Sequence, residues 1–378
     1  MTASPPRLLF VVNAAWFFIS HRLPLAEAAR RAGYEVHIAT GAATADEVRS
    51  LEIAGFNYHS LGLKRASGNP FHNAALLLQL FKVYRAVRPA IVHHVTIKPV
   101  ILGTLAARIL HVPAVVNAVS GLGYSFSSTE SRRKSLRYLV GLAYRACLKH
   151  PRMTVIFQNV DDRLDFLNWT RIRSLNHVLI AGSGVDIKRF YPTPEPGGIV
   201  RVVVPARMLR DKGIVEFAMA IGSLRSKGVL VEGLLAGSPD PENPESLTEP
   251  ELRALETQYG VRWIGHCNDV ADLFSSAHIA CLPSYREGLP KALIEASAAG
   301  RAIVTTDVPG CKHVVEDGVT GLLVPARQVA PLAEAIGRLI ADPGLRLRLG
   351  TAARARAEAQ FGIDRIVSET LHLYSRMK

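Results

Sequence analysis

The first half of the chain alternates short, continuous apolar runs with longer amphipathic ones. Four runs rich in β-branched residues read as strands: 7–12 (RLLFVV), 34–40 (YEVHIAT), 90–96 (AIVHHVT) and 114–120 (AVVNAVS). Stretches of ten or more residues between them read as helices: 22–33, 74–87 and 100–110. Strands that are apolar on both sides are typical of a parallel sheet covered by helices on both faces. This alternation therefore predicts a doubly wound α/β domain.

The same pattern restarts after Pro192. Residues 193–200 (TPEPGGIV) carry the proline and glycine density of a domain boundary, and 200–207 (VRVVVPAR) read as the first strand of a second α/β unit. A chain of 378 residues also exceeds the usual size of one hydrophobic core. We expect two Rossmann-like domains, with the first at 1–185 and the second at 186–361.

Positive charge is concentrated in the first domain. Residues 1–185 hold 22 Lys and Arg against 9 Asp and Glu, whereas residues 186–378 hold 23 of each. An excess on one side is typical of proteins that face anionic lipid or nucleic acid. No uninterrupted apolar run approaches the roughly 20 residues of a membrane span. Residues 7–19 resemble a signal peptide, but Asn13 interrupts the apolar run, so we read this segment as a strand plus a loop.

Several common site motifs are missing from the sequence. No GxGxxG follows the first strand of either domain, and neither GxxxxGK[ST] nor DxD occurs. Hydride transfer, ATP hydrolysis and a carboxylate-held metal–diphosphate site therefore lose their usual support. His93 and His94 are adjacent, but no third ligand lies at a useful spacing, so we predict no metal. The four cysteines are scattered and suit a reducing cytoplasm.

Residues 205–213 (PARMLRDKG) follow the first strand of the second domain. Open α/β sheets bind ligands at this edge. Arg207 and Lys212 bracket a short turn, and Gly213 precedes a helix whose N-terminus favours anions. Two cations in this place suit a diphosphate, and a solvated basic loop is the alternative.

Residues 283–297 (PSYREGLPKALIEAS) place two carboxylates on either side of a turn that leads into a helix. Glu287 precedes the turn, and Glu295 lies about five residues into the helix. Pro290 suits the first turn of a helix because it lacks an amide hydrogen there. Backbone N–H groups at 288–291, together with Lys291, can cradle phosphate while the carboxylates bind hydroxyl groups at its two ends. The alternative for Glu295 is an exposed helical residue.

These segments, with residues 182–192 and 307–325, resemble the retaining nucleotide-sugar glycosyltransferases of family 4, which have the two-Rossmann GT-B fold. The resemblance covers nearly the whole chain. It implies that Glu287 contacts hydroxyls of the donor sugar, Glu295 the ribose, and Arg207 with Lys212 the diphosphate. The remaining donor-binding residues that it implies are Asn13, Gly121, Gly288, Leu289, Pro290 and Lys291. It also implies that a last helix, 362–378, crosses back to the first domain.

Residues 17–40, 93–109 and 115–126 resemble bacterial members that add an N-acetylhexosamine to an undecaprenyl-diphosphate-linked saccharide. Many members have a histidine where this chain has Ser120, and a Gly-Gly turn where it has Asn13 and Ala14. Ser120 or the nearby Asn117 is therefore expected to replace the loop histidine. His21 is a candidate for a polar role toward the acceptor.

Residues 130–150 (ESRRKSLRYLVGLAYRACLKH) mix cations with aromatic and aliphatic residues. This composition suits a helix on an anionic bilayer, and a core-facing helix with a solvated basic face is the alternative. The cations expected to meet lipid are Arg132, Arg133, Lys134 and Arg137.

Together these features predict a retaining glycosyltransferase that is cytoplasmic and peripheral on the inner face of the membrane. It would move a sugar from a nucleotide diphosphate, UDP in our reading, to a lipid-linked acceptor. No metal or other cofactor is expected beyond the donor itself. Two alternatives stay open: a sugar-nucleotide epimerase of the same fold, and a basic nucleic-acid-binding protein, for which no base-reading motif is visible.

Overall fold

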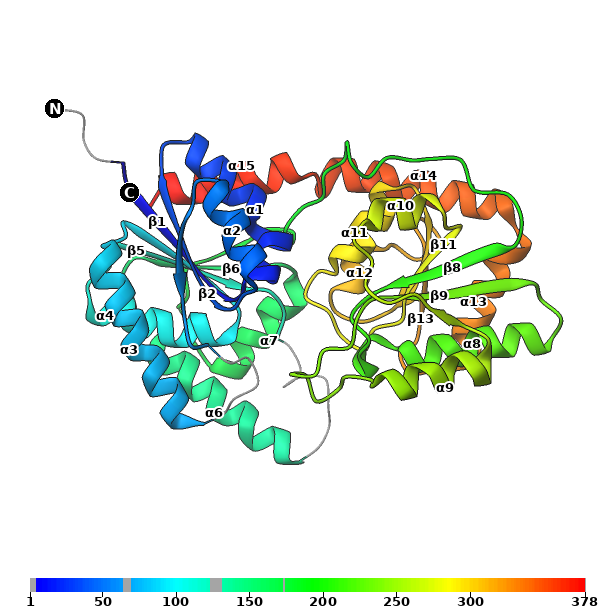
Figure 1. Ribbon diagram of the computed structural model, residues 1–378, viewed down its shortest axis with the longest axis horizontal. Coiled ribbons are helices and arrows are strands. Elements are labelled where there is room, and N and C mark those ends of the chain that lie inside the picture. Colours follow the sequence, from blue (N-terminus) through cyan, green and yellow to red (C-terminus); the bar gives the residue numbers. More distant parts are fainter. Residues whose placement is uncertain (1–4, 64–68, 123–130, 173, 378) are drawn as a thin grey trace. The chain divides into compact units, whose positions relative to one another are not determined.

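The computed structural model describes residues 5–63, 69–122, 131–172 and 174–377, without the side chains of 131–137. The chain forms two compact units (Figure 1). One comprises residues 1–183 with 364–378, and the other comprises 184–363. We call them the N-terminal and the C-terminal unit.

The N-terminal unit is built on a parallel sheet with the strand order β3-β2-β1-β4-β5-β6-β7. Its strands are β1 (Arg7–Ala14), β2 (Glu35–Ala42), β3 (Asn57–Ser60), β4 (Ile91–Val95), β5 (Ala114–Val119), β6 (Met153–Phe157) and β7 (His177–Leu179). The chain adds strands on one side of β1 and then continues on the other side with β4. The strand order therefore reverses between β1 and β4, which is where doubly wound sheets bind ligands.

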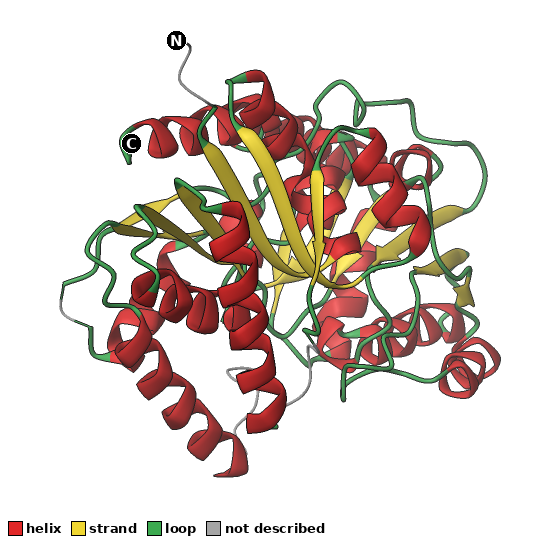
Figure 2. Ribbon diagram, turned by 60° about the vertical axis from the view of Figure 1, so that its left-hand side comes forward, coloured by secondary structure: helices red, strands yellow, loops and turns green. Residues whose placement is uncertain are grey.

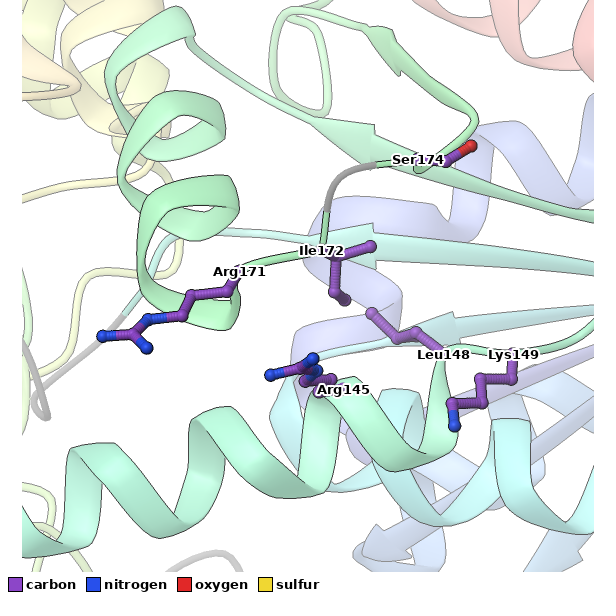
Figure 3. A pocket seen from close by; sticks show the side chains of 6 residues that line it. All are labelled: Arg145, Leu148, Lys149, Arg171, Ile172 and Ser174. Carbon is purple, nitrogen blue, oxygen red and sulfur yellow. The ribbon is translucent and has the colours of Figure 1, made fainter.

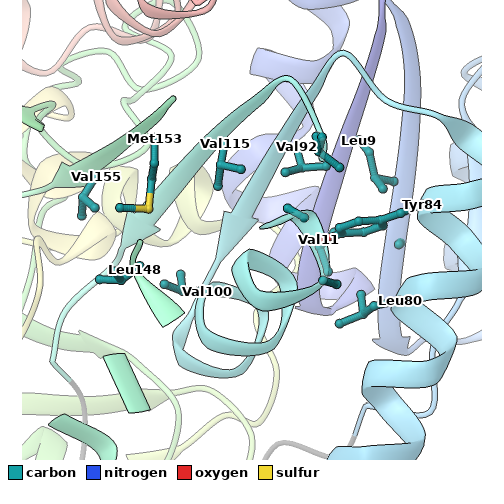
Figure 4. Close-up of a cluster of buried hydrophobic side chains, with 14 of the residues drawn as sticks. Leu9, Val11, Leu80, Tyr84, Val92, Val100, Val115, Leu148, Met153 and Val155 are labelled. Carbon is teal, nitrogen blue, oxygen red and sulfur yellow. The ribbon is translucent and has the colours of Figure 1, made fainter. Parts of the chain in front are cut away.

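Helices cover both faces of this sheet (Figure 2). They are α1 (Ala15–Arg31), α2 (Ala45–Ile53), α3 (Pro70–Val87), the π-helix η1 (Pro99–Gly103), α4 (Thr104–Ile109), α6 (Ser131–Cys147), α7 (Val160–Thr170) and α15 (Ile363–Ser375). Side chains of β1 alternate between two cores. Leu9 and Val11 pack with residues of α3, α6 and α7 (Figure 4), whereas Leu8, Phe10 and Val12 pack with residues of α1, α2 and α15. The strands are apolar on both sides because both faces are covered.

Two helix boundaries differ from the sequence prediction. Helix α1 begins at Ala15, directly after β1, so the predicted loop before residue 22 is wrong. Phe18 is fully buried and meets the ring of Phe10 edge-on at 5.5 Å, which accounts for the apolar run that resembles a signal peptide. Pro24 lies inside α1 and interrupts its helical pattern. The predicted helix at 100–110 begins as η1 and continues as α4.

The C-terminal unit repeats the design with a parallel sheet of order β10-β9-β8-β11-β12-β13. Its strands are β8 (Val200–Pro205), β9 (Val231–Ala236), β10 (Arg262–Trp263), β11 (Ile279–Leu282), β12 (Ala302–Thr306) and β13 (Leu322–Val324). Its helices are η2 (Arg210–Lys212), α8 (Ile214–Ser226), α9 (Glu249–Tyr259), α10 (Val270–Ser275), α11 (Lys291–Ala298), α12 (Cys311–Val314), α13 (Val329–Ala341) and α14 (Pro343–Gln360). Here the strand order reverses between β8 and β11.

Helix α15 packs on the sheet of the N-terminal unit, although it is last in the sequence. Ile366 and Tyr374 are buried among residues of α1 and β1. The Tyr374 hydroxyl lies 2.5 Å from Nδ1 of His93 in β4. Among the described residues, no helix is both long and apolar enough to cross a bilayer.

Candidate active site

The predicted donor residues of the C-terminal unit meet at the carboxyl ends of two neighbouring strands. Arg207 and Lys212 follow β8, and Glu287 follows β11. These strands pair directly, with Val202 opposite Ile279. Sequence segments about 75 residues apart thus come together at the point where the strand order reverses.

Lys212 and Glu287 form a largely buried ion pair. The Lys212 ammonium lies 2.5 Å from Oε1 of Glu287, and the two side chains are 16% and 13% exposed. The Ser284 hydroxyl donates to the same oxygen at 2.8 Å. Little water surrounds the two charges, so their attraction is screened less than at the surface. The sequence analysis predicted that Lys212 is a free cation that binds phosphate. In the structure the charge of Lys212 is instead neutralised by Glu287.

Two glycines let the loops around this pair approach closely. The amide of Tyr285 donates to the carbonyl of Asp211 at 2.9 Å, which joins the loop after β8 to the loop after β11. Gly213 has φ +72°, and a Cβ there would lie 2.2 Å from the carbonyl oxygen of Pro283. Gly310 has φ +87°, and a Cβ there would lie 2.5 Å from the carbonyl oxygen of Glu287. Only glycine fits at these two positions without moving the ion pair.

Arg207 is paired with a residue that the sequence analysis missed. Its guanidinium donates to Oδ2 of Asp240 at 2.5 Å, and Asp240 is 7% exposed. Asp240 follows β9, which is the neighbour of β8 on its other side. An aspartate just beyond the carboxyl end of a strand was the available signal, but it stood in a segment rich in Pro and Glu (SPDPENPE) that reads as an ordinary loop.

Helix α11 carries the second carboxylate of the predicted site. Pro290 is its N-cap, one residue before the predicted first turn, and Glu295 is its fifth residue. Glu295 is 6% exposed, so the alternative of an exposed helical residue is wrong. Its carboxylate lies 3.0 Å from the Lys291 ammonium. Burial raises the pKa of Glu295, and the charge of Lys291 offsets part of this rise.

Two further acidic groups near the ion pair escaped the sequence analysis. Burial raises the pKa of Asp211, and the charge of Lys212 offsets part of this rise. Its Oδ1 has no hydrogen-bond partner among the described residues. The Tyr285 hydroxyl donates to Glu216 at 2.5 Å, while the guanidinium of Arg327 lies 4.3 Å from the Tyr285 ring centre. Asp211 stands in a short basic turn, and Glu216 reads as an ordinary polar residue of the following helix. The sequence therefore gave no signal for either carboxylate.

In the N-terminal unit, the predicted residues lie near the carboxyl ends of β1 and β5. Oδ1 of Asn13 and Oγ of Ser120 are buried without a hydrogen-bond partner among the described residues. Gly121, the next residue, has φ +105°. His21 is stacked on Phe17 in α1, with ring centres 4.1 Å apart. Orphaned polar atoms at a sheet's carboxyl edge suit groups that bind a ligand.

Asn117 is not available for the role that the sequence analysis offered it. Its side-chain oxygen lies 2.7 Å from Nδ1 of His94 and accepts from Thr104 at 3.1 Å, and Asn117 is fully buried. The other ring nitrogen of His94 lies 2.7 Å from the Tyr84 hydroxyl. This network satisfies Asn117 inside the core and leaves Ser120 as the candidate to replace a loop histidine.

The histidine pair does not form a metal site. His93 and His94 face opposite sides of β4, toward Tyr374 and toward Asn117 respectively. Burial lowers the pKa of His94 to about 4, so its ring is neutral at pH 7. No group of three or more potential metal ligands occurs in the described part of the chain.

Four cations were predicted to meet lipid: Arg132, Arg133, Lys134 and Arg137. Their side chains lie outside the part of the chain that the structure describes. The described part of α6 exposes three large apolar side chains. Tyr138 is 66% exposed, Leu139 62% and Leu142 43%. Tyr144 of the same helix is buried in the core, so α6 packs on the unit with one side and exposes these apolar residues on another.

Comparison with known proteins identifies both halves of the chain. The family described as Glycosyl transferases group 1 matches residues 200–342, which contain the Lys212–Glu287 pair and α11. The family described as Glycosyl transferase 4-like matches residues 7–159. The chain belongs to these glycosyltransferases. The predicted enzyme class is therefore confirmed.

Two curated relatives match over nearly their whole length. One is the N,N'-diacetylbacillosaminyl-diphospho-undecaprenol alpha-1,3-N-acetylgalactosaminyltransferase of Campylobacter jejuni, which is 27% identical over 98% of this chain and 99% of its own. Another is the capsular polysaccharide biosynthesis glycosyltransferase CapM of Staphylococcus aureus, which is 26% identical over 94% and 95%. These relatives support a glycosyltransferase of polysaccharide biosynthesis.

Solved structures confirm the predicted GT-B fold. The sucrose-phosphate synthase of Thermosynechococcus elongatus superposes with a TM-score of 0.78 at 19% identity, covering 98% of this chain and 99% of that one. Anabaena HepE in complex with UDP and glucose superposes with a TM-score of 0.77 at 17% identity, covering 98% and 100%. At these identities the likeness concerns the fold.

Proposed function

We propose that this glycosyltransferase moves an N-acetylhexosamine from UDP to a saccharide linked to undecaprenyl diphosphate, with retention of the anomeric configuration. The observation that carries the donor side is the pair of buried carboxylates, Glu287 and Glu295, on either side of the N-terminus of α11. The name of the Campylobacter relative, which contains both N-acetylgalactosaminyl and diphospho-undecaprenol, supports the choice of sugar and acceptor.

Binding of the diphosphate requires an exchange of partners. In the structure Lys212 is held by Glu287 and Arg207 by Asp240. A diphosphate that enters between β8 and α11 draws Lys212 and Arg207 to its oxygens, because phosphate oxygens accept from both kinds of cation. The same exchange frees Glu287 to accept hydrogen bonds from hydroxyls of the donor sugar. Glu295 accepts from the ribose hydroxyls at the far side of the helix start.

The reaction breaks the bond between the anomeric carbon and the β-phosphate oxygen and forms a bond from that carbon to the acceptor oxygen on the same face. Negative charge develops on the leaving diphosphate. Arg207, Lys212 and the N-terminus of α11, with its positive end of the helix dipole, stabilise this charge without a metal ion. The acceptor proton passes to the leaving phosphate oxygen, so no protein nucleophile is required.

The N-terminal unit supplies Ser120 in place of the loop histidine, His21 toward the acceptor, and Asn13 with Gly121 toward the donor. Ser120 and Asn13 have buried polar atoms without partners at the carboxyl edge of the sheet, where hydroxyl groups of a ligand would satisfy them. Gly121 and His21 lie close to them in the sequence. The exposed Tyr138, Leu139 and Leu142 of α6 would rest in the head-group region on the inner face of the membrane, with the four cations that precede them on anionic lipid.

The test begins with melting curves of the protein against UDP, GDP, ADP and their common sugars. We expect a rise of a few degrees with UDP and one UDP-N-acetylhexosamine, since ligands that bind only the folded state stabilise it. The rise should vanish in Glu295→Ala and persist in Glu334→Ala, which removes an exposed glutamate of α13. No shift with any nucleotide would reject the donor site.

The second stage supplies the matching donor with an undecaprenyl-diphosphate-linked saccharide. Proton NMR of the product reports the anomeric configuration directly. A product with the donor's own anomeric configuration supports the proposal, and an inverted product rejects the mechanism. Conversion of the UDP-sugar to its epimer without an acceptor product would identify an epimerase.

A further inference from the structure

The N-terminal unit contains a cationic pocket that neither the donor site nor the acceptor residues use. It has a volume of about 680 Å³ and is lined by Arg145, Leu148, Lys149, Arg171, Ile172 and Ser174 (Figure 3). This volume lies within the range of small-molecule sites. The first three residues lie at the end of α6 or just beyond it, and the last three follow α7.

The pocket lies at the edge of the N-terminal sheet that is opposite the edge with Asn13 and Ser120. Helices α6 and α7 run back from the carboxyl edge, so they end where β6 and β7 begin, at Met153 and His177. Asn13 and Ser120, by contrast, lie at the carboxyl ends of β1 and β5. Because all strands of this sheet are parallel, the pocket and these two residues occupy opposite edges.

The three cations of the pocket are not compensated by any side chain that the structure describes. Arg145, Lys149 and Arg171 are exposed, and no side-chain hydrogen bond or ion pair joins any of them to another described residue. The lining contains no carboxylate. Each helix C-terminus carries roughly half a negative charge, so the ends of α6 and α7 offset about one of the three positive charges. The pocket therefore keeps an excess of positive charge.

The walls of the pocket are held in place by aromatic packing. The Tyr144 ring meets those of Phe166 and Trp169 with centres 4.9 Å and 5.6 Å apart, which joins α6 to α7 next to the pocket. Arg145 directly follows Tyr144, and Arg171 lies two residues after Trp169. In Figure 3, the side chains of Arg145 and Arg171 extend into the same gap between the two helices.

The chemistry of the lining matches a phosphate ester. Two guanidinium groups can each donate two hydrogen bonds to phosphate oxygens, and Lys149 adds a point charge. The Ser174 hydroxyl can donate one more. Leu148 and Ile172 add apolar surface for the alcohol part of an ester. We propose that this pocket is a binding site for a phosphate or diphosphate ester, separate from the donor site.

The face of α6 that leads to the pocket suggests how a lipid could supply this group. Tyr138, Leu142, Arg145 and Lys149 are spaced by three or four residues, so they lie along one side of the helix and its end. Tyr138 and Leu142 are exposed apolar residues, and they precede the two cations. A soluble phosphate ester would use the cations alone, whereas a lipid phosphate would also use the apolar residues.

The experiment compares wild type with Arg145→Gln/Arg171→Gln. The control is Arg338→Gln/Arg348→Gln, which removes two exposed arginines of α13 and α14 that have no described partner. Inorganic pyrophosphate is titrated by calorimetry, and flotation is measured with vesicles of phosphatidylglycerol and phosphatidylcholine. We expect at least tenfold weaker pyrophosphate binding at one site of the pocket variant and unchanged binding in the control.

The two arms distinguish the sources of the phosphate. Loss of both pyrophosphate binding and flotation with phosphatidylglycerol supports the site with a lipid as its source. Loss of pyrophosphate binding alone supports the site with a soluble ester as its source. Equal binding by wild type and both variants, or an equal loss in the control, overturns the proposal.

Pyrophosphate can also enter the proposed donor site, so the UDP-induced melting shift is measured on the same proteins. If the pocket variant retains this shift and loses one pyrophosphate site, the pocket is separate from the donor site. If no protein shows the shift, the donor assignment fails without affecting the comparison at the pocket. Loss of the shift in the pocket variant alone would overturn the claim that the two sites are separate.

Discussion

Lys212 and Glu287 have the strongest direct charge contact among the proposed donor residues. We expect Lys212→Met to lower kcat by roughly 10²- to 10³-fold, which is typical for the loss of one group that stabilises developing charge. Glu287→Gln removes the carboxylate but can still donate and accept hydrogen bonds, so it should raise KM for the sugar donor more than for free UDP. Steady-state kinetics and UDP titration check both variants. Unchanged kcat in Lys212→Met would contradict its role.

The buried carboxylate of Glu295 predicts a particular pH dependence. Burial raises its pKa in the folded state, so folding favours the protonated form. Its contribution to stability is present below the unfolded pKa and is lost as the pH rises through the folded pKa. As the pH rises above about 4.3, the ordinary pKa of glutamate, the melting temperature of wild type should therefore fall relative to that of Glu295→Gln. If the melting temperatures of wild type and Glu295→Gln change with pH in parallel, this expectation is contradicted.

Gly213 tests how closely the loops around the ion pair must approach. Gly213→Ala should cost about 1–2 kcal/mol for the left-handed backbone, and the clash with Pro283 adds to this and displaces Lys212. Gly318 has nearly the same φ, +69°, but a Cβ there meets nothing within 4 Å. Gly318→Ala should therefore lose stability and keep its activity, whereas Gly213→Ala should lose both. Urea unfolding and transferase assays measure the two effects.

At the scale of elements, α15 shows how a helix at the end of the chain stabilises the N-terminal unit. The Tyr374 hydroxyl is its buried polar contact with β4, through His93. Tyr374→Phe keeps the ring and leaves Nδ1 of His93 unpaired, so we expect a loss of about 1–3 kcal/mol. Tyr191→Phe removes the hydroxyl of an exposed tyrosine and should be neutral. Urea unfolding that shows equal stability for both variants would contradict a structural role for this contact.

The strands were easier to predict than the helix boundaries. The runs at 7–12, 34–40, 90–96 and 114–120 all lie on strands, because parallel strands buried on both faces carry a strong local signal. The start of α1 was missed because five apolar residues in a row and an internal proline conceal its helical period. Its true boundary depends on the packing of Phe18 against Phe10, which is a contact between elements.

At the scale of the whole molecule, the net positive charge lies in the first half of the chain. If this charge attracts an anionic membrane, raising the salt from about 0.1 M to 1 M should release the protein from phosphatidylglycerol vesicles, since the screening length falls from about 10 Å to 3 Å. UDP binding should weaken less, because Lys212 and Glu295 are largely shielded from solvent. Flotation and calorimetry at both salt concentrations measure this difference. If membrane binding and UDP binding weaken equally with salt, the expected difference between them is contradicted.

The sequence by itself determined the class of the fold, the restart of the pattern after Pro192 and the segments that carry the proposed donor residues. These features depend on local periodicity and on short motifs, which involve residues that are neighbours in the sequence. The tertiary structure decided which charges meet. Asp240 holds Arg207 and Glu287 holds Lys212 because β9, β8 and β11 are neighbours in the sheet. It also assigned Asn117 to the core and opened a cationic pocket between the ends of α6 and α7, since burial and pairing depend on contacts between distant segments.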